Sequence, residues 1–442
     1  MKLNRKNLVI FIIDIIFLLL GILVIYFTED NTKTFPRLGV FLIVISLYMS
    51  FKVRKNQNLA FMFAVIAFIN ISLSITDLIQ YGETVAKWQL AFRNTIYNTY
   101  NAKATVLLNV VLNLFITANY CDKVAEKSIG KNIVRKDNKV ISILGYIILT
   151  LILLTGYGND MRSGTGYVSN SNTLYEYAIV IFAMIWYYSK NNRKINILLI
   201  IYSIIYSLYS LYYGDRSAAF LMIFLVILLY LKDISLKKMV IFAIVALVVS
   251  NFIAEYRENN NSNLYKLMIN TMERGMYSDT VSYSYYTSIT ISALHHYEEK
   301  PIKLFPKYLK SFFIGGRGDA IASLSVYARE KYMDLFNRDG GLYHSPFYAF
   351  GGYKGVIIGA IVLGCCIRYF YSKYSNNLII VQMLITAFTI RWYLYNPLSL
   401  YRSAILIPII FLTLCDFYVK LTQKKKIYAD SYNKIIEWRR NV

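Results

Sequence analysis

Long apolar runs alternate with short polar segments along almost the whole chain. Most runs hold about 16–22 residues, the length at which an α-helix crosses the hydrocarbon core of a bilayer. The pattern therefore predicts an all-α, polytopic integral membrane protein with about twelve transmembrane helices. We place these spans at residues 8–27, 38–51, 59–80, 104–120, 140–156, 174–189, 195–213, 217–231, 239–254, 346–367, 378–395 and 402–420.

One long polar stretch interrupts this pattern late in the chain. It divides the chain into nine spans within residues 1–254, a large extracytoplasmic loop at 255–345, three spans within 346–420 and a basic tail at 421–442. The first apolar run has no small-residue cleavage site after it, so we expect a retained helix rather than a cleaved signal peptide.

Lysine and arginine gather in every second polar segment, which tests the predicted number of spans. Examples are the segments 52–55, 123–139, 190–194 and 232–238. The positive-inside rule places these segments in the cytoplasm together with both termini, as an even number of spans requires.

Composition supports this interpretation. The 442 residues are 57% hydrophobic and only 17% charged, whereas about a quarter of a soluble domain is charged. The net charge of +23 comes mostly from the predicted cytoplasmic segments. It therefore reflects topology and does not indicate nucleic-acid binding.

The polar residues form no recognisable metal or nucleotide site. The four cysteines lie in or beside predicted spans and lack metal-ligand spacing. The three histidines, His295, His296 and His344, lack the spacing of a helical zinc site. We therefore expect no metal and no dissolved cofactor.

A short outer turn, Gly214 to Ser217, joins two predicted spans and carries Asp215 and Arg216. Short outer loops rarely contain basic residues, and a planar guanidinium can bind a phosphate through two hydrogen bonds. Arg216 is therefore a candidate diphosphate ligand. The alternative is a topogenic or snorkelling arginine beside an acidic turn residue.

Arg391 lies inside a predicted span, near its outer end. A charge at this depth must face the protein interior or a wet cavity, because lipid does not solvate it. Together with Arg402, at the outer start of the last span, it could extend a cationic pocket. The alternative is a structural ion pair with Asp77 or Glu176, which also lie near outer ends of spans.

Three arginines of the long loop, Arg274, Arg317 and Arg329, lie in distinctive settings. Arg317 belongs to a glycine-rich run whose backbone N–H groups could surround an anion, although a flexible turn explains the run equally well. Residues 320–333 have helical spacing, so Arg329 and Glu330 are expected on a short surface helix. A solvated charged face is the alternative for this pair.

His344 directly precedes the tenth predicted span and follows the glycine pair Gly340-Gly341. It is a candidate general base or hydrogen-bond donor. Lys354 lies near the outer end of the same span and could add to a phosphate site. Packing of the glycines around Lys354 against a neighbouring helix is the alternative.

The whole layout resembles the O-antigen and capsule repeat-unit polymerases of bacteria, the Wzy type. The shared features are about twelve spans, cytoplasmic termini and one large outer loop late in the chain. Segments 214–217, 273–280 and 340–351 carry the more specific resemblance. Similar proteins often have an acidic residue and Asn-Phe-Gly in the last of these segments, where this chain has His-Ser-Pro-Phe-Tyr-Ala-Phe-Gly.

The resemblance implies transfer of a glycan from a polyprenyl diphosphate to a hydroxyl of a second lipid-linked repeat unit, at the outer face of the bacterial cytoplasmic membrane. Arginines would stabilise the charge that develops on the departing diphosphate. The predicted diphosphate ligands are Arg216, Arg317, Arg329, Arg391, Arg402 and Lys354. The predicted catalytic residues are Arg216, Arg274 and Arg317, with His344, Glu330 or Asp215 as the base. A chain-length regulator and a flippase are the partners that the resemblance implies, besides membrane lipid.

Three other functions remain open at this point. A ligase-type transferase would move a finished glycan to another acceptor, and a scaffold would use the loop only for binding. A polysaccharide or lipid transporter would favour charges at the midplane and broken helices in related halves. Asp14 is the only charge deep within a predicted span, and the polar features gather on one side. This favours a one-sided reaction site over alternating access.

Overall fold

The computed structural model describes residues 5–29, 36–76, 96–116, 134–156, 173–213, 215–231, 236–258, 263–275, 278–314, 323–332, 340–373 and 375–423. Within these ranges every regular element is a helix, apart from one isolated bridge between Asp137 and Ser189. The all-α prediction is therefore confirmed for the part of the chain that the structure describes.

Each predicted span coincides with one or two helices. The first nine are α1 (Arg5–Tyr26), α2 (Pro36–Lys52), α3 (Gln57–Ile75), α5 (Ile96–Phe115), α7 (Lys139–Thr155), α8 (Thr173–Tyr188), α9 (Arg193–Tyr212), α10 (Arg216–Tyr230) and α11 (Leu236–Glu258). The last three predicted spans correspond to α16 (Ser345–Ser372), to α17 (Asn376–Ala387) with α18 (Thr389–Leu394), and to a helix at Ser399–Gln423 that begins with the π-helical η4 (Ser399–Leu406).

Five of the described helices are long and apolar enough to cross a membrane: Leu8–Tyr26, Gln57–Ile75, Arg193–Tyr212, Ser345–Ser372 and Ser399–Gln423. Five shorter apolar helices lie at Lys139–Thr155, Leu174–Tyr188, Arg216–Tyr230, Ile241–Tyr256 and Asn376–Ala387. By length and composition these helices do not confirm the predicted number of about twelve spans.

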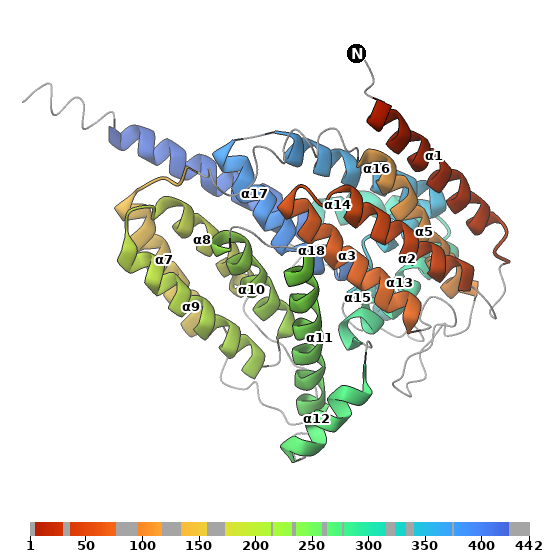
Figure 1. Cartoon of the computed structure of the whole chain (residues 1–442), viewed down its shortest axis with the longest axis horizontal. Helices are drawn as coiled ribbons and strands as arrows, with labels where there is room; N and C mark the ends of the chain where they lie inside the picture. Colours follow the sequence, from red (N-terminus) through yellow and green to blue (C-terminus); the bar gives the residue numbers. More distant parts are fainter. Residues whose placement is uncertain are drawn as a thin grey trace, which may run out of the picture.

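The helices form two groups that meet around α17 (Figure 1). One group contains α7, α8, α9 and α10, and the other contains α1, α2, α3, α5 and α16. Helix α10 packs against α17, which also contacts α3 and α8, so α17 links the two groups. Helix α11 leads to α12 (Leu264–Glu273), which projects at one end of the molecule in Figure 1.

Helices at the periphery keep an apolar face uncovered. Leu19 of α1, Leu154 of α7, Ile204 of α9 and Val245 of α11 are each more than half exposed. Helices α3, α8, α10 and α17 instead bury apolar side chains on most sides. Such extended uncovered apolar faces are suited to contact with lipid tails, because a helix satisfies its own backbone hydrogen bonds.

Asparagine and aspartate side chains cap the N-termini of several helices. Asn138, Asn192 and Asp215 each accept a hydrogen bond from the backbone N–H three residues later, at the starts of α7, α9 and α10. Such caps satisfy donors that lack a partner in the first turn. Helix α12 ends before Gly275, whose φ of +54° is left-handed and therefore favours glycine.

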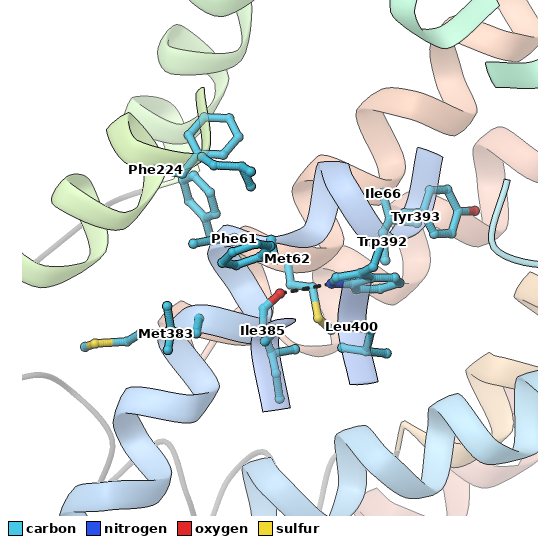
Figure 2. Packing of buried hydrophobic residues seen from close by; sticks show 14 of the residues in the cluster. Phe61, Met62, Ile66, Phe224, Met383, Ile385, Trp392, Tyr393 and Leu400 are labelled. Carbon is cyan, nitrogen blue, oxygen red and sulfur yellow. Dashed lines mark hydrogen bonds between the residues drawn. The ribbon is translucent and has the colours of Figure 1, made fainter. Parts of the chain in front are cut away.

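A break in the bundle separates α17 from α18 at Phe388. The carbonyl group of Ile385 accepts a hydrogen bond of 3.0 Å from Trp392 Nε1 (Figure 2). Thr389 Oγ1 donates to the Thr386 carbonyl oxygen at 2.7 Å. Side chains of the same segment thus satisfy the backbone groups near the break, as an interior site away from water requires.

An ion pair and its hydrogen bonds join α1, α2 and α5, which belong to the group that also contains α3 and α16. Lys52 Nζ lies 2.7 Å from Asp14 Oδ1, and both side chains are almost fully buried. Tyr48 Oη and Asn113 Nδ2 donate to the same carboxylate at 3.0 and 3.1 Å. Lys52 therefore points into the protein, although the sequence places it in a basic cytoplasmic segment. The partner of Asp14 could not be inferred from sequence spacing.

A second polar cluster surrounds Asp416 of the last helix. Its carboxylate accepts hydrogen bonds from Lys136 at 2.5 Å, Tyr188 at 2.6 Å and Asn377 at 2.8 Å. These residues come from the start of α7, the end of α8 and the start of α17. All four helix ends are predicted to lie on the cytoplasmic side. Their contact therefore agrees with the predicted alternating orientation of the spans.

The predicted loop at 255–345 is helical over most of its described residues. It contains α12, α13 (Asp279–Tyr297), the 3₁₀ turn η2 (Pro301–Leu304), α14 (Phe305–Ile314) and α15 (Leu324–Lys331). Helix α15 falls within the predicted helical segment 320–333. Helix α13 packs against α5 and α16 and is buried in the bundle, which the sequence pattern did not predict.

The helix that corresponds to the predicted span 104–120 begins earlier than expected. Helix α5 already begins at Ile96, and Asn98, Asn101 and Lys103 are buried within the protein. Residues 77–95 lie outside the described part of the chain.

Candidate functional site

Helix α13 is a buried helix of unusual polarity. Its apolar contacts come mainly from Tyr285, Tyr286 and Ile289, which belong to the main core. Its buried hydroxyl-bearing residues, besides tyrosine, are Ser282, Ser284, Thr287, Ser288, Thr290 and Ser292. Because buried polar groups are costly unless they are paired, so many hydroxyls inside a membrane protein indicate a polar site.

His344 and Asn101 form the centre of the first part of this site. His344 Nε2 lies 2.9 Å from Asn101 Oδ1. The same amide oxygen accepts hydrogen bonds from Ser288 Oγ at 2.7 Å and Ser292 Oγ at 3.1 Å. Three elements, α5, α13 and the residue preceding α16, therefore meet at one oxygen atom.

The glycine pair before His344 explains how the histidine reaches this position. Gly340 and Gly341 have φ values of +123° and +136°, which side-chain-bearing residues rarely adopt. Gly341 N donates to the Leu394 carbonyl oxygen, and Tyr343 N donates to the Tyr393 carbonyl oxygen, both at 2.9 Å. The segment thus lies along the end of α18, and this contact holds His344 beside α5.

Complete burial lowers the pKa of His344 to about 3, because a buried site disfavours the imidazolium. The residue lies just before α16 and is neutral at physiological pH. The bond to Asn101 places the ring proton on Nε2, which leaves Nδ1 with a lone pair. His344 Nδ1, Asn101 Nδ2 and Ser284 Oγ are buried and have no partner among the described residues. These atoms can therefore receive hydrogen bonds from, or donate them to, a bound polar molecule.

The second part of the site surrounds Tyr395, just after α18. The Arg391 guanidinium carbon lies 4.8 Å from the centre of the Tyr395 ring. The charges of Arg216 and Asp215 also act on this tyrosine, and Thr280 of α13 lies near its hydroxyl. The charges of two arginines from distant parts of the sequence thus both act on Tyr395, near the first turn of α13.

Arg216 and Asp215 have different roles in this arrangement. Asp215 caps α10 and accepts hydrogen bonds from Ala218 N at 3.1 Å and Ser217 Oγ at 2.8 Å. Arg216 Nη1 donates to the Ser250 carbonyl oxygen at 2.9 Å. Within the described residues Arg216 forms no ion pair, so no carboxylate neutralises its charge.

Two other candidate arginines are neutralised by acidic residues. Arg391 pairs with Glu176 of α8, and both side chains are about a quarter exposed. This is the structural alternative that the sequence had left open. Arg274, which follows α12, pairs with Glu255 of α11, and both side chains are nearly buried. These pairs fix helix ends beside Arg216.

The remaining candidate residues lie elsewhere or cannot be placed. Arg402 is half-buried in η4, and its Nε has no partner among the described residues. Lys354 of α16 and Glu330 of α15 are exposed and make no described contact with the His344 centre. Arg329 lies in α15, and Arg317 lies outside the described residues.

Helix α13 connects the two parts of the site. Thr280, Ser284, Ser288 and Ser292 follow one another at four-residue spacing, which places them along one side of a helix. A Cβ atom at Gly340 would lie 3.1 Å from Ser284 Oγ and 3.5 Å from the Tyr395 ring. The hydroxyl stripe therefore runs from Tyr395 and the arginines to the His344 centre.

Comparison with known proteins bears on this arrangement. The family described as O-antigen polysaccharide polymerase Wzy matches residues 9–426, almost the whole chain. The chain belongs to the Wzy family of O-antigen polymerases. Searches of curated proteins and of solved structures gave no match. This Wzy polymerase is therefore an integral membrane protein of a glycosyltransferase-like class that acts on lipid-linked repeat units.

Sequence reasoning missed the Wzy polymerase residues that surround His344. A signal was present in α5, where four asparagines recur every few residues. They are Asn98, Asn101, Asn109 and Asn113, and all four are buried. Asparagines at helical spacing within a span indicate a polar interior face, because lipid does not pair them. Tyr395 had no comparable signal among the chain's 41 tyrosines.

Proposed function

We propose that this Wzy-family protein transfers a glycan from a polyprenyl diphosphate to a hydroxyl of a second lipid-linked repeat unit. The bond from the anomeric carbon to the diphosphate oxygen breaks, and a glycosidic bond to the acceptor oxygen forms. The acceptor hydroxyl loses its proton, and the polyprenyl diphosphate leaves. The observation that carries this proposal is that Arg216, which forms no ion pair among the described residues, acts on Tyr395, while the neutral, buried His344 lies beside the hydroxyl-lined helix α13.

Arg216 is the residue best suited to the departing diphosphate. Its charge is not neutralised by a carboxylate among the described residues, and it acts on Tyr395. Negative charge on the leaving group increases as the anomeric bond breaks. A fixed guanidinium therefore stabilises the transition state more than the bound substrate. Arg402 and the loop residues Arg317 and Arg329 remain further candidates for the same group.

His344 is the residue best suited to the acceptor hydroxyl. Its Nδ1 lone pair can accept a hydrogen bond and so orient the attacking oxygen. A pKa of about 3 makes it a weak base before reaction. Negative charge developing on a nearby diphosphate favours the imidazolium, so proton transfer accompanies departure of the leaving group. Asp215 is engaged as a helix cap and Glu330 is exposed on α15, which makes both less suitable as the base.

We further propose that the reaction takes place at the outer face of the bacterial cytoplasmic membrane, with both termini in the cytoplasm. The meeting of the predicted cytoplasmic helix ends around Asp416 supports this orientation. His344 and Tyr395 lie at helix ends of the opposite predicted sidedness. A chain-length regulator and a flippase are the proposed partners in the cell.

The test uses purified protein and a lipid-diphosphate-linked repeat unit, with no other protein. A ladder of lipid-linked oligomers is the expected product. Removing one charge-stabilising group from such a site costs about 3–4 kcal/mol, so Arg216→Ala should slow the ladder by roughly a hundred- to thousandfold. His344→Ala should also slow it. Arg368→Ala is the matched control, because Arg368 is exposed at the far end of α16.

The outcomes separate the alternative functions. A single transfer product instead of a ladder would identify a ligase-type transferase. Movement of the lipid-linked substrate across vesicle membranes without any new glycosidic bond would identify a transporter. A ladder that survives both site substitutions would place the reaction centre elsewhere in the protein.

A further inference from the structure

A row of aromatic rings lies beside the His344 centre and has no role in the reaction described above. We call it the aromatic platform and define it as Tyr97, Tyr100, His296, Tyr297 and Tyr332. Tyr100 and His296 stack, with ring centres 4.9 Å apart and planes at 23°. Tyr97 lies 5.6 Å from His296 and 5.9 Å from Tyr297. Tyr297 lies 5.4 Å from Tyr332.

Two residues of the platform are exposed and three are half-buried. Tyr297 is 45% exposed and His296 is also exposed, whereas Tyr97, Tyr100 and Tyr332 are half-buried. Most other aromatic clusters of the chain lie deep in the core, such as the stacked pair Tyr175 and Tyr206. Aromatic rings with polar tips that share an open face are a common means of binding amphipathic ligands.

Polar groups border the platform and fix its geometry. Glu298 accepts hydrogen bonds from Lys331 at 2.6 Å, Tyr327 at 2.8 Å and Tyr332 at 3.0 Å. Burial alone would raise the pKa of Glu298, but these hydrogen bonds lower it, so the carboxylate stays charged and Lys331 neutralises it. Burial and the neighbouring His295 lower the pKa of His296, which keeps its ring neutral.

The platform lies next to the His344 centre, towards the C-terminal end of α13. Tyr100 precedes Asn101 on α5, and His296 lies one turn beyond Ser292 on α13. The helical rise of 1.5 Å per residue separates Thr280 from His296 by about 24 Å. The arginine site and the platform thus lie toward opposite ends of α13, with His344 between them. This separation is long enough for a diphosphate followed by several sugar rings.

We propose that the aromatic platform is a saccharide-binding subsite that holds the glycan part of a lipid-linked repeat unit while its reacting end lies at His344. The apolar C–H face of a sugar ring packs on Tyr297 and His296, and its hydroxyls contact the polar border. A polyprenyl tail would favour an aliphatic groove instead of hydroxyl-bearing rings. An anionic ligand would meet a border whose charges are already paired. This inference rests on the proposed function, because it takes the glycan of that reaction as its ligand.

The test measures binding of the lipid-free repeat-unit oligosaccharide, which mild acid releases from its lipid diphosphate. Saturation-transfer difference NMR with the full-length protein in detergent gives the affinity. Loss of one aromatic contact is worth about 0.5–1.5 kcal/mol, so Tyr297→Ala and His296→Ala should each weaken binding roughly three- to tenfold. Tyr297→Phe keeps the ring and should bind normally. Tyr212→Ala is the matched control, because Tyr212 of α9 is 53% exposed and lies outside the platform.

The same variants are then assayed for polymerisation. The KM for the lipid-linked substrate should rise in Tyr297→Ala while kcat changes little, because His344 and Arg216 are intact. Unchanged affinity in both alanine variants, or an equal loss in Tyr212→Ala, would overturn the subsite. Polymerisation without any effect of the platform variants would reject the subsite and keep the proposed function. Ring-dependent oligosaccharide binding without polymerisation would keep the subsite and reject the proposed function.

Discussion

His344 and Asn101 lie 243 residues apart in the sequence and share a hydrogen bond of 2.9 Å in the interior of the protein. The bond joins the residue before α16 to the second turn of α5, and the other imidazole nitrogen has no hydrogen-bond partner among the described residues. The chemistry that we propose depends on this relationship. Its consequences can be measured apart from catalysis.

The first prediction concerns the pH dependence of stability. The pKa of His344 is about 3 in the folded protein and about 6.5 in an unfolded chain, so below pH 6.5 only the unfolded chain gains a proton there. Its contribution to the free energy of unfolding is complete above pH 6.5 and falls by about 1.4 kcal/mol per pH unit on acidification towards pH 3. Thermal unfolding in detergent between pH 7 and 4.5 should therefore show a steeper loss for wild type than for His344→Gln. Parallel curves would show that His344 is not buried and neutral.

The second prediction concerns the buried ion pair of Asp14 and Lys52. Removing one partner leaves an unpaired charge in the interior, which costs about 3–5 kcal/mol. Lys52→Met alone should therefore lower the unfolding temperature sharply, whereas Asp14→Asn combined with Lys52→Met should restore much of it. Arg54→Met, at an exposed neighbouring position, is the control. A double variant less stable than either single variant would contradict the assigned pairing.

The third prediction separates Arg391 from Arg216. Arg391 pairs with Glu176, and because both side chains are partly exposed, their coupling should be about 1 kcal/mol. A double-mutant cycle of Arg391→Ala and Glu176→Gln, measured by thermal unfolding, checks this value. Arg216→Ala should instead reduce polymerisation with little change in stability. The assigned ion pair is wrong if Arg391→Ala lowers the stability by the same amount with and without Glu176→Gln.

The fourth prediction concerns the turn that positions His344. Gly341 has a φ of +136°, and a Cβ atom there would lie 2.7 Å from Ile291 Cδ1. Gly341→Ala should therefore cost roughly 1–3 kcal/mol of stability and reduce polymerisation, because His344 moves with the turn.

Gly351→Ala serves as the control for this turn. A Cβ atom at Gly351, within α16, would meet no other atom within 4 Å, so stability and polymerisation should be retained. Equal behaviour of the two alanine variants would show that the turn does not position His344.

Hydropathy and charge patterns predicted much of the fold. The apolar runs coincide with helices, and the short helix α15 falls where helical spacing predicted it. The pattern did not predict the burial of α13, which lies within the long polar stretch assigned to the extracytoplasmic loop. Inside the bundle Tyr285, Ser288 and Ser292 donate hydrogen bonds to asparagine side chains of α5, and sequence periodicity does not record such pairing.

Candidate site residues could be named from the sequence but not ranked by it. Arg216 lies in a short outer turn, Arg391 near the outer end of a predicted span and Arg274 in the long loop, and no local pattern ranks them. Only the packed structure distinguishes them. Arg274 pairs with Glu255 and Arg391 pairs with Glu176, whereas Arg216 forms no ion pair among the described residues.

The sequence by itself determined the helical architecture, the membrane character and the family of this protein. The physical reason is that a chain in lipid must satisfy its backbone hydrogen bonds locally, so apolar segments of sufficient length form helices whatever their neighbours are. The tertiary structure alone decided which polar side chains meet. Asn101, His344 and Ser288 come from separate helices, and their contact depends on how those helices pack rather than on any local pattern.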